Sequence, residues 1–114
     1  MKYALLVYTD DASDPADRPM EPAIATALEQ PDVTGWVRLR GAGSATTLSV
    51  ERGRTLLTDG PFVASKEFVG GIILVDAADL DAALVVAGEL QATRADEGGA
   101  IEVRPILQER LAGA

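Results

Sequence analysis

The chain has 114 residues, of which 47% are hydrophobic and 25% are charged, a composition typical of a globular domain and not of a disordered or fibrous chain. Eighteen acidic against ten basic residues give a net charge of -8, which disfavours binding to nucleic acid or to anionic lipid. Cysteine and histidine are both absent, which excludes disulfides, thiol chemistry and the commonest general base and metal ligand.

The length predicts one domain over residues 1–114. We expect a homodimer, because a chain of this size has few elements with which to cover a flat apolar sheet, and a partner would cover the rest. Residues 1–8 are too short for a secretion signal, and no apolar run approaches the roughly eighteen residues of a membrane helix. We therefore expect a cytoplasmic protein that does not enter a membrane.

The first third of the chain contains two predicted elements and a loop. Residues 3–8 form a nearly continuous apolar run, which predicts a central strand buried on both sides. The acidic stretch 10–18 predicts an exposed loop, and because it lacks the ligand spacing of a calcium-binding loop we expect no metal there. A short helix is predicted over residues 20–30, which has a proline in its first turn and ends at another.

The middle of the chain is rich in strand-forming residues. A strand is predicted over residues 33–39, and Arg38 and Arg40 fall on one face because side chains alternate along a strand. The glycines at 41 and 43 lack the third glycine of a dinucleotide-binding loop, so we expect no cofactor. Two β-rich runs then read as a hairpin, over residues 46–50 and 54–58.

The last third repeats the order strand, helix, strand. A strand is predicted over residues 68–75, in which Gly70-Gly71 indicates a bulge or a close backbone approach. Asp76 is predicted to cap an amphipathic helix that runs to about Thr93. The last strand is predicted over residues 100–107, and its proline favours an edge position. The whole order predicts an α+β fold, a ferredoxin-like βαββαβ arrangement with an added β-hairpin.

One stretch carries a family resemblance. Asp59-Gly60-Pro61-Phe62 is followed by Lys66-Glu67, by Gly70-Gly71 and later by Ile101-Glu102-Val103-Arg104-Pro105. This pattern resembles the DGPF branch of the YCII-related family. The resemblance implies a protein of the dimeric α+β barrel type. A histidine–aspartate pair is often taken as the catalytic centre of related proteins, and the absence of histidine here prevents that mechanism from being carried over.

The candidate site residues surround the same motif. Asp59 is held in a turn beside Phe62, which predicts a partly desolvated carboxylate suited to proton transfer; the alternative is that it accepts hydrogen bonds from its own turn. Phe62 is expected to contact the substrate. Lys66 would hold an anionic substrate, or else it pairs with a neighbouring carboxylate. Arg38 and Arg104, together with Arg40, would form a wall that binds carboxylate or phosphate, unless they pair with carboxylates on a solvated sheet face.

Two functions follow from these residues. The first is binding of a small anionic metabolite in a cleft near Asp59, with lyase- or isomerase-type proton transfer as the associated activity. The alternative is a non-catalytic homodimeric interaction module. The family resemblance connects that alternative with regulation by sigma factors of the extracytoplasmic-function class.

Overall fold

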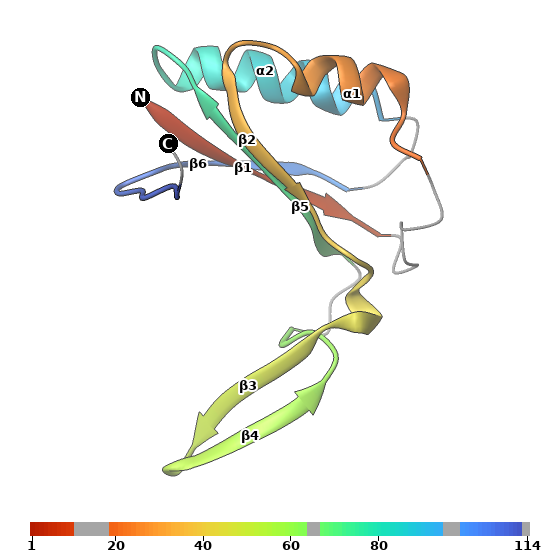
Figure 1. Ribbon diagram of the computed structural model, residues 1–114, viewed down its shortest axis with the longest axis vertical. Coiled ribbons are helices and arrows are strands. Elements are labelled where there is room, and N and C mark those ends of the chain that lie inside the picture. The colour runs from red at the N-terminus through yellow and green to blue at the C-terminus, as the bar shows by residue number, and fades with distance from the viewer. Residues whose placement is uncertain (11–18, 64–66, 95–98, 113–114) are drawn as a thin grey trace.

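The computed structural model describes residues 1–10, 19–63, 67–94 and 99–112. In these ranges a four-stranded antiparallel sheet has two helices on one side, and a two-stranded hairpin projects away from it (Figure 1). The elements are β1 (Lys2–Thr9), α1 (Pro22–Leu28), β2 (Val33–Arg38), η2 (Ala42–Ser44), β3 (Thr46–Glu51), β4 (Arg54–Asp59), β5 (Phe68–Asp76), α2 (Leu80–Ala92) and β6 (Ile101–Pro105). None of the helices in the described ranges is long and apolar enough to cross a membrane.

The strand order of the larger sheet is β2-β5-β1-β6. In this order each helix connects two strands that flank a third, which is the split βαβ arrangement of the ferredoxin-like fold. The predicted α+β class is therefore confirmed, with β3 and β4 as the added hairpin between β2 and β5. β1 and β5 are the central strands, and β6, which ends at Pro105, is an edge strand as its proline predicted.

The hydrophobic core lies between the sheet and the two helices. Tyr3 and Leu5 of β1 are almost completely buried there, whereas Ala4 and Leu6, which point to the opposite face, are only half-buried. The prediction that β1 is buried on both sides was wrong, because both helices pack on the same side of the sheet (Figure 1). The buried core residues are Tyr3, Leu5, Leu28, Ile73, Val75, Ala83, Ala87 and Leu90.

The glycine pair of β5 lies between β1 and β2, the two strands that pair with β5. Val7 pairs with Gly71 and Tyr8 pairs with Val69, so Gly70 is an extra residue in β5 and forms a bulge. A Cβ atom on Gly71 would lie 3.0 Å from the carbonyl oxygen of Val37 in β2. Both predicted reasons for the glycine pair, a bulge and a close backbone approach, are confirmed.

The start of α2 differs from the prediction. Asp76 is the last residue of β5, its amide donates to the carbonyl of Asp32, and its Oδ1 lies 3.2 Å from the amino terminus. The helix is capped three residues later by Asp79, whose Oδ1 accepts a hydrogen bond of 2.9 Å from the amide of Ala82. Asp76 was a wrong choice of cap because the pairing of β5 with β1 continues to Lys2 and keeps Asp76 in the strand.

The segment after β6 is fastened to the start of β1. The amide of Ile106 donates to the carbonyl of Lys2 over 2.9 Å, and Nζ of Lys2 donates to Oε1 of Glu109. This hydrogen bond and the charge of Glu109 raise the pKa of Lys2 above its ordinary value. The contact therefore joins residues that are 107 positions apart in the sequence.

The hairpin of β3 and β4, which we call the arm (residues 46–59), points away from the helices and the larger sheet (Figure 1). The chain has a radius of gyration of 15.7 Å, compared with about 13 Å for a compact chain of this length. Arg52 and Gly53 both have positive φ, 51° and 78°, as a tight two-residue hairpin turn requires. Leu48, Val50 and Leu57 of the arm are 68%, 73% and 74% exposed.

Candidate functional site

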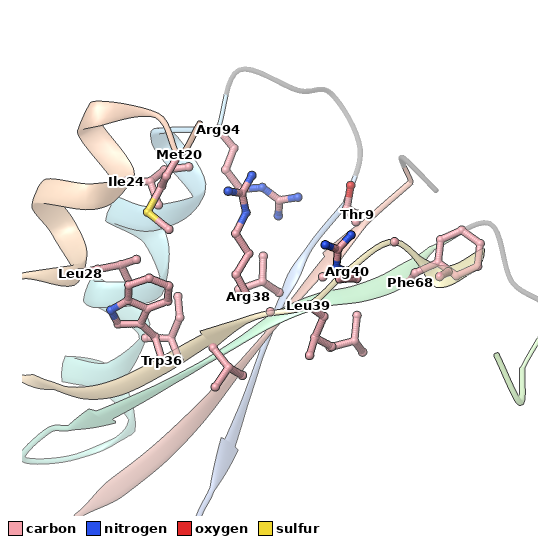
Figure 2. A pocket seen from close by; sticks show the side chains of 18 residues that line it. Thr9, Met20, Ile24, Leu28, Trp36, Arg38, Leu39, Arg40, Phe68 and Arg94 are labelled. Carbon is pink, nitrogen blue, oxygen red and sulfur yellow. The ribbon is translucent and has the colours of Figure 1, made fainter. Parts of the chain in front are cut away.

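A cavity of about 220 Å³ opens between α1 and the sheet, at the end where β2 and β5 lead toward the arm. Figure 2 shows its wall, to which β1, α1, β2, β5 and Arg94, two residues beyond the end of α2, all contribute. The lining residues are Val7, Thr9, Met20, Ile24, Leu28, Trp36, Val37, Arg38, Leu39, Arg40, Gly41, Ala42, Phe68, Val69, Gly70, Gly71, Ile73 and Arg94. We call this cavity the arginine pocket.

One end of the arginine pocket is apolar. Met20, Ile24 and Leu28 come from α1 and the residues before it, and Trp36 comes from β2; Figure 2 shows all four together. Leu28 is buried, while Trp36 is 47% exposed and lines the pocket wall. An apolar wall of this kind takes up hydrocarbon or aromatic surface from water.

Two arginines enter the arginine pocket from β2 and the residues that follow it. Arg38 ends β2, opposite Gly71 of β5, and Arg40 lies two residues further on. The amide of Leu39 donates to the carbonyl of Gly70 over 2.9 Å, which holds the backbone between the two arginines against β5. Alternation along β2 predicts that the two side chains lie on the same side, and both line the arginine pocket.

A third arginine comes from the other end of the fold. Arg94 follows α2, and its Nη2 donates to the carbonyl oxygen of Tyr8 over 2.7 Å while its Nη1 donates to Oε1 of Gln91 over 3.1 Å. These two bonds use two of the five N–H donors of the guanidinium and fix its orientation. In Figure 2 the side chains of Arg38 and Arg94 extend toward the same part of the pocket, away from Trp36.

The charge of the arginine pocket is opposite to that of the protein. Three of the ten basic residues line it, in a chain with a net charge of -8. None of the lining residues that the structure describes carries a carboxylate. Guanidinium groups bind carboxylate and phosphate through paired hydrogen bonds, and their attraction for anions increases in a partly dry cavity. The described lining of the arginine pocket therefore carries positive charge.

A second cavity, of about 610 Å³, lies next to the arginine pocket where the arm joins the sheet. The two cavities share residues 39–42 together with Phe68 and Val69. Pro61 and Val63 of the motif line this second cavity, as does Glu67. The motif thus contributes to the wall at the base of the arm, beside the arginine pocket.

Asp59 and Phe62 lie in a different place from the arginines. Asp59 is the exposed last residue of β4, where it pairs with Thr46, and Phe62 is 78% exposed. Neither residue is part of the lining of the two cavities. Gly60, which follows Asp59, has a φ of 102°. Its amide donates to the carbonyl of Ala45 over 2.7 Å, and its carbonyl accepts a hydrogen bond from Oγ1 of Thr47 over 2.8 Å. These two hydrogen bonds hold the turn after Asp59.

Arg104 is separated from Arg38 by the sheet itself. It lies in β6 opposite Ala4, on the face that the helices do not cover, and its Nη1 is 3.9 Å from Oε2 of Glu102. Arg38 therefore shares its pocket with Arg40 and Arg94 and not with Arg104. Lys66 lies outside the described residues, as does most of the predicted acidic loop. Among the residues that are described, no three carboxylates gather as a metal site would need.

Sequence reasoning did not select Arg94 or Trp36 as site residues. The available signal for Arg94 was weak: one basic residue just after a helix, where a positive charge also suits the helix dipole. Trp36 was visible as an aromatic residue in a predicted strand, two positions before Arg38, so that both lie on one face of that strand. What no pattern could show is that the end of α2 reaches the same pocket as β2.

Comparison with known proteins identifies the family of this chain. The sequence model of the YCII-related domain matches residues 1–110. The chain belongs to the YCII-related family. It is also 34% identical over 115 aligned residues to an uncharacterised protein of Rhizobium meliloti (strain 1021), an alignment that covers 93% of this chain and 92% of that protein. Membership of the DGPF branch within the YCII-related family stays a prediction from the motif.

Proposed function

We propose that this YCII-related protein binds a small anionic metabolite in the arginine pocket. The observation that carries the proposal is the meeting of Arg38, Arg40 and Arg94, from distant parts of the chain, on the lining of one cavity. A guanidinium that is already oriented loses little conformational freedom on binding, and Arg94 is held by Tyr8 and Gln91 before any ligand arrives. The anionic metabolite that the sequence predicts would therefore bind at Arg38, Arg40 and Arg94.

The test is calorimetric titration of the protein with small anions at low ionic strength, with inorganic phosphate, acetate and benzoate as probes. Replacing Arg38 by glutamine removes a charge-assisted contact, and we expect binding to weaken about tenfold to a hundredfold. Arg104→Gln is the matched control, because this arginine lies on the other face of the sheet. Equal losses in both variants, or no binding of any probe by the unaltered protein, would contradict the proposal.

Proton transfer by Asp59, with a lyase or isomerase reaction as the result, stays a prediction. The carboxylate lies at the exposed end of β4, so a substrate in the arginine pocket would meet it only if the arm or the ligand changed position. The roles predicted for Lys66 and Phe62 as substrate contacts stay predictions in the same sense.

A second candidate function is that of a homodimeric interaction module. Ala4, Leu6, Ile72 and Leu74 alternate with buried core residues and therefore point to the face of the sheet that lacks helices. An apolar sheet face of this kind is stabilised when a second copy covers it. Light scattering tests the dimer: we expect twice the chain mass at micromolar concentration, and a monomer after Leu6→Asp. A monomeric unaltered protein would contradict this candidate. Association with a sigma factor stays a prediction from the resemblance.

A further inference from the structure

The arginine pocket is divided into an apolar end and a cationic end. Trp36 and Leu28 form one end with Met20 and Ile24, while Arg38 and Arg94 direct their guanidinium groups to another part of the cavity (Figure 2). A purely ionic site for phosphate or sulfate needs no such apolar wall. A purely apolar ligand would make no use of the guanidinium groups that reach the pocket from β2 and from beyond the end of α2. The ligand that satisfies both ends has one anionic group and one apolar body.

The volume of the arginine pocket indicates what size of body it accommodates by itself. The arginine pocket has a volume of about 220 Å³. An apolar cavity of about 150 Å³ accommodates a benzene molecule, so the arginine pocket has room for one ring and a carboxylate. A larger ligand would extend into the adjoining cavity of about 610 Å³.

We propose that the arginine pocket takes a carboxylate whose body is a single ring or a branched chain of similar size, with the carboxylate on Arg38 and Arg94 and the body against Trp36 and Leu28. The proposal rests on the proposed function, since it names the class of anion bound at the same site. Arg94 holds one end of the ligand in place, because its own position is set by Tyr8 and Gln91. The planar guanidinium forks match a carboxylate, and the indole face of Trp36 matches a ring.

The protein contains its own reporter for this test. Trp36 is the one tryptophan of the chain, and it lines the pocket at 47% exposure, so a ligand body that covers it changes the intrinsic fluorescence. The probes are benzoate and cyclohexanecarboxylate, which have both parts, acetate and inorganic phosphate, which have only the anionic part, and benzyl alcohol, which has only the ring. Calorimetry on the same samples measures the affinities independently of fluorescence.

We expect benzoate and cyclohexanecarboxylate to bind at least about tenfold more tightly than acetate, because they bury a ring against the apolar end. They should also bind at least about tenfold more tightly than benzyl alcohol, because benzyl alcohol lacks the carboxylate. Arg38→Gln should remove this difference in affinity, and Arg104→Gln should preserve it. Ile24→Ala enlarges the apolar end and should weaken benzoate binding but leave phosphate binding unchanged. The comparison of probes on the unaltered protein keeps the test independent of whether any variant folds.

Three results would overturn the proposal, and they differ in what else they overturn. If acetate and phosphate bind as tightly as benzoate and all binding depends on Arg38, the anion site stands and the ring-sized carboxylate is wrong. If benzyl alcohol binds as tightly as benzoate, the arginines do not recognise the ligand and both proposals fail. If no probe binds at millimolar concentration, the proposed function itself fails.

Discussion

The body of the protein, formed by the four-stranded sheet and the two helices, and the arm are both built by antiparallel pairing, yet they bury their side chains to very different extents. In the body Leu5 and Val75 have no measurable exposure, because α1 and α2 cover that face of the sheet. In the arm Leu48 and Leu57 pair directly across the two strands and are still 68% and 74% exposed. Strand pairing satisfies the backbone in both regions, but only the body excludes water from its side chains.

This difference in burial affects how stable each region is and which of them can hold a ligand site. A two-stranded hairpin alone is marginally stable in water, so the arm depends on its own cross-strand pairs and on the hydrogen bonds of Gly60 at its base. The body can hold a preformed cavity because its walls are packed against a core. The arginine pocket accordingly lies in the body, and the motif around Asp59 lies where the arm begins and ends.

The contrast in burial between the body and the arm is tested most directly by shortening one leucine in each region. Leu5→Ala should lower the free energy of unfolding by about 2–5 kcal/mol, because it leaves a cavity in the core. Leu48→Ala, the matched change in the arm, should alter it by less than about 0.5 kcal/mol. Chemical denaturation of both variants measures the two values. An equally large loss for Leu48→Ala would mean that the arm is covered in solution.

A smaller effect is expected where the chain leaves the body for the arm. Gly71→Ala places a Cβ atom 3.0 Å from the carbonyl of Val37, so β2 and β5 must shift apart, at a cost of about 1–3 kcal/mol. Gly43→Ala is the control, since no atom lies within 4 Å of the added methyl group. Thermal unfolding compares the two variants, and the same midpoint in both would show that the close approach is absent in solution.

A still smaller change in stability is expected at the start of α2. Asp79→Ala removes the cap of α2 and should cost about 1 kcal/mol of unfolding free energy. Asp76→Ala removes an exposed ion pair with the amino terminus and should cost less than about 0.5 kcal/mol. Denaturation with urea distinguishes them. A larger loss for Asp76→Ala would restore Asp76 as the residue that starts the helix.

The smallest effect is expected at the end of the arm. Asp59→Asn should leave the affinity for benzoate and phosphate unchanged, because the carboxylate lies outside the lining of the arginine pocket. Calorimetric titration beside Arg38→Gln measures the contrast. If Asp59→Asn weakened anion binding as strongly as Arg38→Gln, the arm would have to move to the pocket when ligand is bound, and the separation between arm and body would be lost.

Much of the fold was accessible from the sequence because its signals are local. The apolar run at 3–8, the turn at Arg52-Gly53 and the glycine pair of β5 each predicted an element or an irregularity that the structure contains. The cap of α2 was not accessible in the same way. Asp76 and Asp79 are both aspartates near the start of the helix, and the pairing of β5 with β1, set by residues far away, decides between them.

The candidate site was predictable only in part, and the reason is distance along the chain. Alternation along one strand places Arg38 and Arg40 on one side, and this relation needs nothing beyond the strand itself. Arg94 reaches the same pocket because its guanidinium bonds the carbonyl of Tyr8, 86 residues earlier in the sequence. Arg104, chosen from its residue type, lies across the sheet because β6 turns that side chain to the face without helices.

The order of local patterns along the chain was enough to specify the strands, the helices and the ferredoxin-like arrangement, since periodicity reports which residues avoid water. It could not specify which face of the sheet the helices cover or which charges share a cavity. Those relations depend on how the crossovers bring distant segments together. The acidic net charge of -8 belongs to the whole chain, whereas the cationic character of the arginine pocket exists only after the chain has folded.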